Sequence, residues 1–96
     1  MNDETEIVRE DGAARGRYVI ALPDGAEAEL TYGRRDGLLV ADHTFVPPEH
    51  RGKQLAERLV AALIADARAD GQRIVPLCSY VAAQFRRHPE WADLKA

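Results

Sequence analysis

The sequence predicts an α+β domain in which a mixed, mostly antiparallel sheet of about five strands packs against one main helix. Two turn signals separate alternating apolar segments in the front half, an apolar stripe with helical period starts near Lys53, and a strand-like run follows it. The chain has 96 residues, of which 46% are hydrophobic, enough for one core and too few for two. We therefore expect a single domain over residues 1–96.

The front half is expected to form a meander of antiparallel strands. In "EAELTY", Ala28, Leu30 and Tyr32 alternate with polar residues, the period of a half-buried strand. The segment "GRYVIAL" precedes it across a Pro-Asp-Gly turn, and "LLVADHTFV" follows it across Asp36-Gly37. Residues 1–14 are expected to be flexible or to hold a short first strand in "TEIVR".

The back half is expected to begin with the main helix, between the fourth and fifth strands. Its apolar stripe consists of Leu55, Ala56, Leu59, Val60, Leu63, Ile64 and Ala67. Gly71 is typical of the residue that ends a helix. The run "RIVPLCSY" then predicts a fifth strand parallel to the fourth, and "VAAQFRRHPEWADL" a short C-terminal helix broken at Pro89.

Composition excludes several classes of function. The net charge is -3, from 13 basic and 16 acidic residues, so no positive field gathers nucleic acid or an anionic membrane. A single cysteine, Cys78, excludes an internal disulfide and fits a reducing compartment, and the polar start "MNDETEIVRED" lacks the apolar segment of a secretory signal. We expect a cytoplasmic protein. His50 and His88 have no metal-ligand spacing with Cys78, so no metal is expected.

The stretch "VPPEHRGKQLAERLV" places a tight basic turn directly before the main helix. A helix N-terminus carries unpaired N–H groups and a partial positive charge, so Arg51, Gly52 and Lys53 predict an anion site. Glycine lets the backbone approach a pyrophosphate closely. The alternative is a polar loop with solvated charges. The nucleotide-hydrolase P-loop is excluded because Gln54 follows the lysine, and the dinucleotide fingerprint because its glycines are absent.

A wider stretch, "HTFVPPEHRGKQLAERLV", resembles the acetyl-CoA-binding motif of the GNAT superfamily of N-acetyltransferases. With "VPLCSYV", a phenylalanine and "HPEW", the chain is similar, over about residues 15–94, to the compact GNAT-like subfamily that lacks N-terminal helices. Arg51 and Ala56 match the two ends of the motif. Gln54 stands where a glycine is usual, and we expect Gln54→Gly to cost a little helix stability without weakening binding of CoA.

The resemblance implies a coenzyme A site between the fourth and fifth strands. Those strands, residues 38–46 and 73–79, would splay apart so that the pantetheine arm bonds to the fourth, with the thioester near His43, Cys78 and Tyr80. The implied function is acetyl transfer from acetyl-CoA to an amine acceptor, either a small molecule or a protein. The alternative is a CoA-binding or protein-interaction module with little catalysis. The implied cofactor-binding residues are Phe45, Val46, Arg51, Gly52, Lys53, Gln54, Leu55, Ala56 and Ser79.

Acetyl transfer to an amine needs a neutral amine, a donor for the oxyanion and a proton for the departing thiolate. His43 is a candidate base, or else a core histidine, since alternation groups it with Leu39, Ala41 and Phe45. Tyr80 is a candidate proton donor or a cap on the core. Cys78 is a buried apolar residue, a general acid or acyl-accepting nucleophile, or part of the channel wall.

Overall fold

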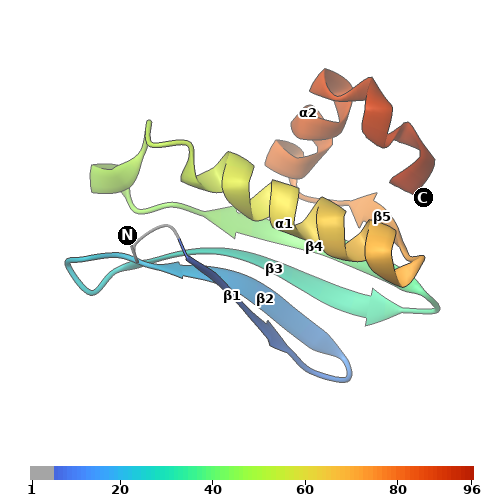
Figure 1. Ribbon diagram of the computed structural model, residues 1–96, viewed down its shortest axis with the longest axis horizontal. Coiled ribbons are helices and arrows are strands. Elements are labelled where there is room, and N and C mark those ends of the chain that lie inside the picture. The colour runs from blue at the N-terminus through green and yellow to red at the C-terminus, as the bar shows by residue number, and fades with distance from the viewer. Residues whose placement is uncertain (1–5) are drawn as a thin grey trace.

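The computed structural model describes residues 6–96 and shows one sheet with its helices (Figure 1). Along the chain the elements are β1 (Ile7–Asp11), β2 (Arg15–Ala21), β3 (Glu27–Arg35), β4 (Leu38–Phe45), the 3-10 helix η2 (Pro48–His50), α1 (Leu55–Asp70), β5 (Arg73–Pro76), α2 (Ser79–Arg87) and the 3-10 helix η3 (Pro89–Leu94). The strands lie in sequence order, β1 to β4 antiparallel and β5 parallel to β4. The predicted fold class is confirmed.

The two predicted turns form the hairpins of the meander. In the first, Gly25 has φ of 88°, and the Asp24 carboxylate accepts the N–H of Ala26 at 3.1 Å. In the second, Asp36 and Gly37 have φ of 50° and 79°, the two positive values of a type I′ turn. Such turns match the twist of the strands they join, so the local sequence sets the register of β3 against β4.

The short first strand is present as β1, which pairs with β2; residues 1–5 lie outside the described part of the chain. Arg9 ties this strand to the rest of the domain. Its Nε donates to the Tyr32 hydroxyl at 2.9 Å, and its Nη1 lies 3.1 Å from Oδ2 of Asp66 on α1. The guanidinium also lies 5.3 Å from the ring centroid of Tyr18.

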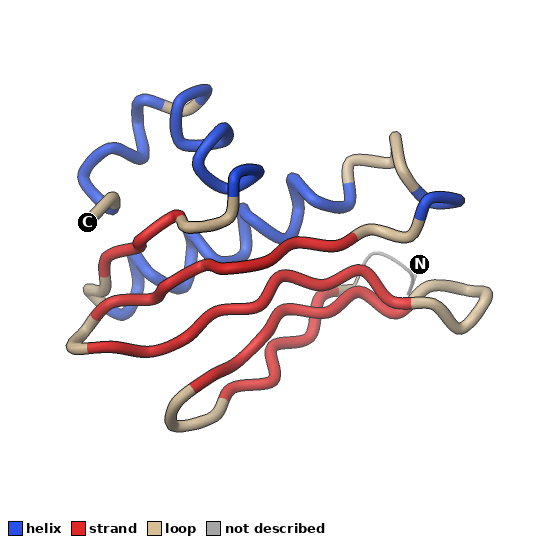
Figure 2. Tube along the Cα trace, turned by 180° about the vertical axis from the view of Figure 1, so that it is seen from behind, coloured by secondary structure: helices blue, strands red, loops and turns tan. Residues whose placement is uncertain are grey.

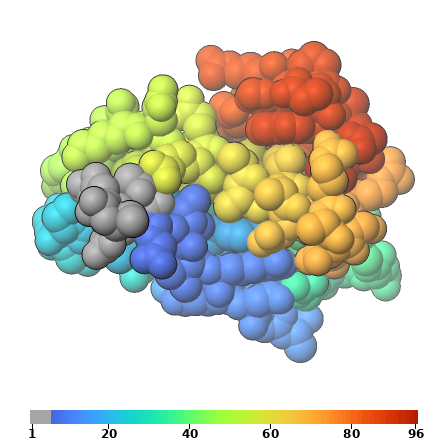
Figure 3. Space-filling view, viewed as in Figure 1, coloured from blue at the N-terminus to red at the C-terminus, as the bar shows by residue number. Residues whose placement is uncertain are grey.

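The core lies between α1 and one face of the sheet (Figures 1 and 2). The predicted stripe of α1 is buried except for the half-buried Ala56, and Gly71 ends the helix at φ of 68°. The space-filling view shows the C-terminal helices, in red, directly against α1, in yellow (Figure 3). The core side chains come from β2, β3, β4, α1, β5, α2 and η3: Tyr18, Ile20, Ala28, Leu30, Tyr32, Leu39, Ala41, Leu55, Leu59, Val60, Leu63, Ile64, Ala67, Ile74, Val81, Phe85 and Leu94.

A β-bulge in β4 changes which side chains face the core. Thr31 pairs with His43 but Tyr32 pairs with Ala41, so Asp42 is an extra residue on β4. Beyond the bulge, Thr44 lies opposite the buried Leu30. The interpretation of His43 as a core residue beside Ala41 is therefore wrong: His43 is exposed, on the face turned away from α1.

The fifth strand is shorter than the expected range of 73–79. It ends at Pro76, which has no N–H to continue a ladder. The chain then turns, and the Cys78 N–H donates to the Ala41 carbonyl at 2.9 Å. Ser79 is the first residue of α2, so Cys78 and Tyr80 belong to a helix start and not to a strand. The predicted break of the C-terminal helix is present, since α2 ends at Arg87 and Pro89 begins η3.

Candidate functional site

The edge of β4 is unpaired over its last residues. Pairing with β5 ends at Ala41 opposite Pro76, whereas β4 continues to Phe45. Among the described residues, none of the strands lies on this side of Thr44 and Phe45. The divergence leaves a fork in the sheet, with backbone groups of β4 available to an extended ligand.

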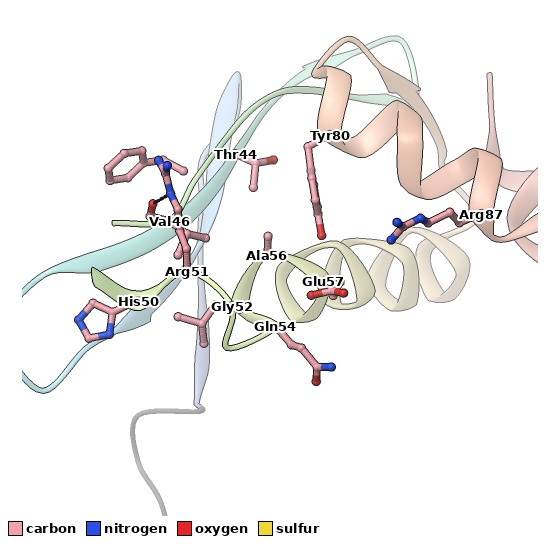
Figure 4. Close-up of a pocket in the computed structure, with 12 residues that line it drawn as sticks. Thr44, Val46, His50, Arg51, Gly52, Gln54, Ala56, Glu57, Tyr80 and Arg87 are labelled. Carbon is pink, nitrogen blue, oxygen red and sulfur yellow. Dashed lines mark hydrogen bonds between the residues drawn. The ribbon is translucent and has the colours of Figure 1, made fainter. Parts of the chain in front are cut away.

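A hollow of about 500 Å³ opens at this fork (Figure 4). The end of β4, the loop after it and the first turn of α1 supply most of its wall, and α2 closes the far side. Tyr80 and Arg87 extend from α2 towards α1 in the close-up view. The lining residues are Thr44, Phe45, Val46, His50, Arg51, Gly52, Gln54, Leu55, Ala56, Glu57, Tyr80 and Arg87.

One wall of the hollow is the N-terminus of α1. The first helical hydrogen bond runs from the Arg58 N–H to the Gln54 carbonyl at 3.2 Å, so the N–H groups of residues 55–57 have no partner within the helix. The side chain of Gln54, the residue before the helix, makes no capping hydrogen bond to them. Gly52 and Gln54, with φ of 87° and 63°, turn the chain into the helix through the left-handed region. The result is an anion-binding geometry of backbone donors.

Three side-chain contacts fix the loop before α1. Arg51 Nε donates to the Val46 carbonyl at 3.0 Å, which spans the loop at its base. Buried His50 has Nδ1 3.1 Å from Lys53 Nζ and Nε2 3.0 Å from Oδ2 of Asp24. Because an ammonium only donates, Nδ1 accepts and Nε2 carries the proton that it donates to Asp24. This bond, with the Ala26 N–H, lowers the pKa of Asp24.

Tyr80 is the hydroxyl-bearing side chain that α2 contributes to the hollow. Its Oη accepts a hydrogen bond from Gln84 Nε2 at 3.3 Å. Burial raises the pKa of Tyr80, and the carboxylate of Glu57 raises it further, with Arg87 partly opposing them. The hydroxyl is therefore protonated at neutral pH and able to donate a proton.

Cys78 lies behind Thr44, where β4 and β5 part. Its sulfur is 3.5 Å from the Thr44 hydroxyl oxygen. Burial raises the pKa of this thiol, but hydrogen bonds from Thr44 and from the backbone N–H groups of Val81 and Tyr80 outweigh it, and the net pKa is lowered. The thiol does not line the hollow.

The structure brings most of the sequence-predicted site residues together. Seven of the expected cofactor-binding residues and the candidate donor Tyr80 line the hollow: Phe45, Val46, Arg51, Gly52, Gln54, Leu55 and Ala56. Lys53 and Ser79 do not line it, because Lys53 turns towards His50 and Ser79 is exposed at the start of α2. His43 and Cys78 also lie outside its wall.

The sequence analysis did not predict four of the residues that line the hollow: Thr44, His50, Glu57 and Arg87. Glu57 could have been predicted from the sequence, since it is one helical turn beyond Gln54 and so lies near the same end of the helix. Thr44 could not have been predicted, because no sequence pattern indicates the bulge that turns its side chain inward. His50 and Arg87 depend on tertiary packing.

Within residues 6–96 no helix is long and apolar enough to cross a membrane. The same part of the chain contains no group of three or more His, Cys, Asp or Glu side chains that could hold a metal ion.

Comparison with known proteins decides the family. The sequence model of the GCN5-related N-acetyltransferases matches residues 17–94. The chain belongs to this family. Its structure is similar to the solution NMR structure of a protein from Staphylococcus aureus assigned as a GCN5-like N-acetyltransferase, with a TM-score of 0.74 and 26% sequence identity over 99% of this chain and 91% of that one. The GCN5-related fold and family place the protein among the acyltransferases.

Proposed function

We propose that this GCN5-related protein transfers an acetyl group from acetyl-CoA to an amine acceptor. The observation that carries the proposal is the continuity of the hollow, which runs from the unpaired edge of β4 to the uncapped N-terminus of α1. An elongated ligand with an amide-bearing arm and an anionic group fits such a path. Acetyl-CoA has both, in its pantetheine arm and its pyrophosphate.

The anionic group is assigned to the first turn of α1. The N–H groups of residues 55–57 point from the helix start, and the partial positive charge of the helix end adds to them. Gly52 has no side chain to obstruct a pyrophosphate. Arg51 supports the loop through Val46 and supplies a positive charge at the wall.

The pantetheine arm is assigned to the end of β4. Residues 44–46 line the hollow and have no β5 partner, so their backbone groups can bond to the amides of the arm as a neighbouring strand would. The side chain of Phe45 shares the opposite face with Glu29, its partner on β3, and is 41% exposed. Phe45 would therefore contribute to the site through its backbone.

In the transfer step the amine nitrogen bonds to the thioester carbonyl carbon, the carbon–sulfur bond breaks, and the sulfur leaves as a thiolate. Tyr80 gives its hydroxyl proton to that thiolate, because it lines the hollow and its raised pKa keeps it protonated. A backbone N–H at the end of β4 stabilises the oxyanion. The amine loses its proton to His43 or to solvent, and Tyr80 is reprotonated from solvent.

The acceptor is assigned to the sheet face turned away from α1. Acetyl-CoA fills the hollow on the α1 side, so the acceptor approaches the fork from the other side, where His43 is exposed. Phe45 and Leu77, 41% and 66% exposed, lie at the fork as well. This open surface suits an amine carried on a larger molecule.

Two measurements test the proposal. Calorimetry with acetyl-CoA determines whether the donor binds, and release of free CoA thiol across a panel of small amines and lysine-containing peptides determines whether transfer occurs. We expect amine-dependent thiol release above the rate of thioester hydrolysis. Tight binding without amine-dependent release would favour the CoA-binding module instead, and absence of binding would overturn both.

A further inference from the structure

Gln84 is a buried polar side chain on the apolar face of α2. It is 3% exposed and lies on the same stripe as the buried Val81 and Phe85, a position that suits an apolar residue. An amide taken out of water is unfavourable unless it is hydrogen-bonded. Packing alone therefore does not account for an amide at this position, and the transfer chemistry described above assigns it no role.

The amide of Gln84 contacts the atom that carries the proton for the departing thiolate. Its Nε2 donates to Oη of Tyr80 at 3.3 Å. The two residues are four apart in α2, and side chains in a helix lean towards its N-terminus, so the amide lies over the turn that carries the tyrosine. The bond thus joins a buried group to a side chain that lines the hollow.

We propose that Gln84 is a positioning residue for the transfer step, whose amide holds the Tyr80 hydroxyl oxygen so that the hydroxyl proton points to the departing thiolate. The inference rests on the proposed function, because it assigns a partner to the proton donor of that reaction. The proton of a phenol lies near the plane of the ring, in one of two orientations. A donor at one of these two positions leaves the other for the proton.

The same bond favours the tyrosinate that proton transfer produces. When the proton leaves, Oη becomes negatively charged, and an N–H bond to a charged oxygen is shorter and about twice as strong as one to a neutral oxygen. The separation of 3.3 Å exceeds the usual range of about 2.7–3.2 Å, so the bond has room to shorten as the charge develops. Burial and Glu57 raise the pKa of Tyr80 and Arg87 lowers it, whereas the Gln84 amide acts without adding a charge.

A double-mutant cycle tests whether Gln84 acts through Tyr80. Gln84→Met keeps the length of the side chain and its fit to the stripe of α2 but has no N–H to donate. In the wild-type background it should lower kcat about tenfold with little change in the KM for acetyl-CoA. In the Tyr80→Phe background, where there is no oxygen to accept the bond, the same substitution should leave kcat unchanged. An equal loss in both backgrounds would make Gln84 a structural residue and overturn the proposal.

Nuclear magnetic resonance detects the bond without a transfer assay. The chain has three glutamines, Gln54, Gln72 and Gln84, and one asparagine, so few side-chain amide signals overlap, and the signal that Gln84→Met lacks is that of Gln84. Tyr80→Phe keeps the aromatic ring and removes only the hydroxyl, so the Gln84 amide signal should move and its protons should exchange faster with solvent. The Gln72 signal should stay in place. An unchanged Gln84 signal would show that the bond is absent and overturn the proposal.

Gln72→Met is the matched control, because it makes the same change beyond the C-terminal end of α1, outside the wall of the hollow. It should transfer acetyl groups at the wild-type rate. Thermal melting of each variant checks that it is folded.

The outcomes distinguish this inference from the proposed function. If Tyr80→Phe lowers kcat and Gln84→Met does not, the inference fails while the proposed function stands. If Tyr80→Phe keeps the wild-type kcat, the donor role of Tyr80 and the inference both fail, and acetyl transfer stands. If wild type shows no amine-dependent thiol release, the proposed function fails and the inference with it.

Discussion

The sulfur of Cys78 lies 3.5 Å from the hydroxyl oxygen of Thr44, and this contact joins the start of α2 to the end of β4 that β5 leaves unpaired. Thr44 lines the hollow and Cys78 lies behind it. The same hydroxyl can donate to a thiolate, which is one of the causes of the lowered pKa of Cys78. The pKa of the Cys78 thiol therefore depends in part on the position of Thr44 at the fork.

The first prediction concerns this pKa. The rate of Cys78 alkylation by iodoacetamide should rise with pH at a midpoint below that of a cysteine in a short unstructured peptide, because the folded environment stabilises the thiolate. Thr44→Val removes the hydroxyl donor while burial continues to favour the thiol, so the midpoint should move to higher pH. Thr31→Val, on the opposite face of the sheet, is the control. An unchanged midpoint in Thr44→Val would show that the backbone donors alone lower the pKa.

The second prediction separates Tyr80 from Cys78. Tyr80→Phe removes the proton donor and should lower kcat about a hundredfold, with little change in the KM for acetyl-CoA. Cys78→Ala should keep activity within about threefold and wild type should show no acetyl adduct by intact mass, because the thiol is outside the hollow wall. Since the pKa of Tyr80 is raised above its ordinary value near 10, its ionisation should cause no loss of rate below about pH 10. An acetylated Cys78 and an inactive alanine variant would make Cys78 the nucleophile.

The third prediction concerns Glu57, which lines the hollow in the first turn of α1. A negative charge there repels an anionic ligand, so Glu57→Gln should bind CoA about two- to fivefold more tightly at low salt, with less effect at high salt. The variant should also lose about 0.3–1 kcal/mol of stability, because an acidic side chain favours a helix N-terminus. Calorimetry at two salt concentrations measures the first effect and thermal melting the second.

Asp36→Asn is the matched control for Glu57→Gln. It removes the same charge from the β3–β4 turn, at the opposite end of β4 from the hollow. Equal gains in CoA affinity from both substitutions would indicate a general effect of net charge rather than a local one.

The sequence predicted the fold well because local signals agreed with tertiary packing. The dipeptide Asp36-Gly37 by itself strongly favours a two-residue hairpin turn. The apolar stripe from Leu55 to Ala67 determines which face of α1 is buried. The tight turn before α1 was also predictable, because Arg51 and Gly52 directly precede a helical period. These features depend on residues close in the chain.

The errors arose where distant residues decide the structure. The bulge at Asp42 appears only in the pairing of β4 with β3, and it reverses the side chains that follow, so His43 is exposed and Thr44 faces the hollow. We predicted too late an end for β5 because "VPLCSY" has a strand-like composition. Pro76 is a local signal against that prediction, because proline is disfavoured inside a strand. The turn of Lys53 towards His50 depends on Asp24, a contact between segments far apart in the sequence.

The fourth prediction concerns Gly52, whose φ of 87° is strained for any side chain although a Cβ there would meet nothing within 4 Å. Gly52→Val should therefore cost about 1–2 kcal/mol of stability through the backbone and weaken CoA binding at least tenfold, because the loop that presents the helix N-terminus must shift. Gly37→Val is a close match, with φ of 79° and equally open surroundings in the distant β3–β4 turn. It should melt earlier yet bind CoA as wild type does. Similar CoA affinity in both variants would remove Gly52 from the site.

The last prediction concerns Gln54, which precedes α1 with φ of 63° and ψ of 25°. The expectation that glycine here would cost helix stability treated the position as a helical turn, and the structure reverses it. In the left-handed region a residue with a Cβ is disfavoured by about 1–2 kcal/mol, which exceeds the entropy cost of about 0.5–1 kcal/mol that glycine adds. Gln54→Gly should thus leave the apo melting temperature unchanged or raise it by a few degrees.

The same substitution should bind CoA at least as tightly as wild type, because it opens the wall of the hollow without moving the backbone. Gln54→Ala is the informative control, since it removes the amide side chain but keeps the strained backbone. If both variants lose affinity, the glutamine amide itself contacts the ligand. If alanine binds as wild type and glycine binds more weakly, the strained loop is the feature that holds the pyrophosphate, because a rigid left-handed turn then fixes the N–H groups that a flexible glycine releases.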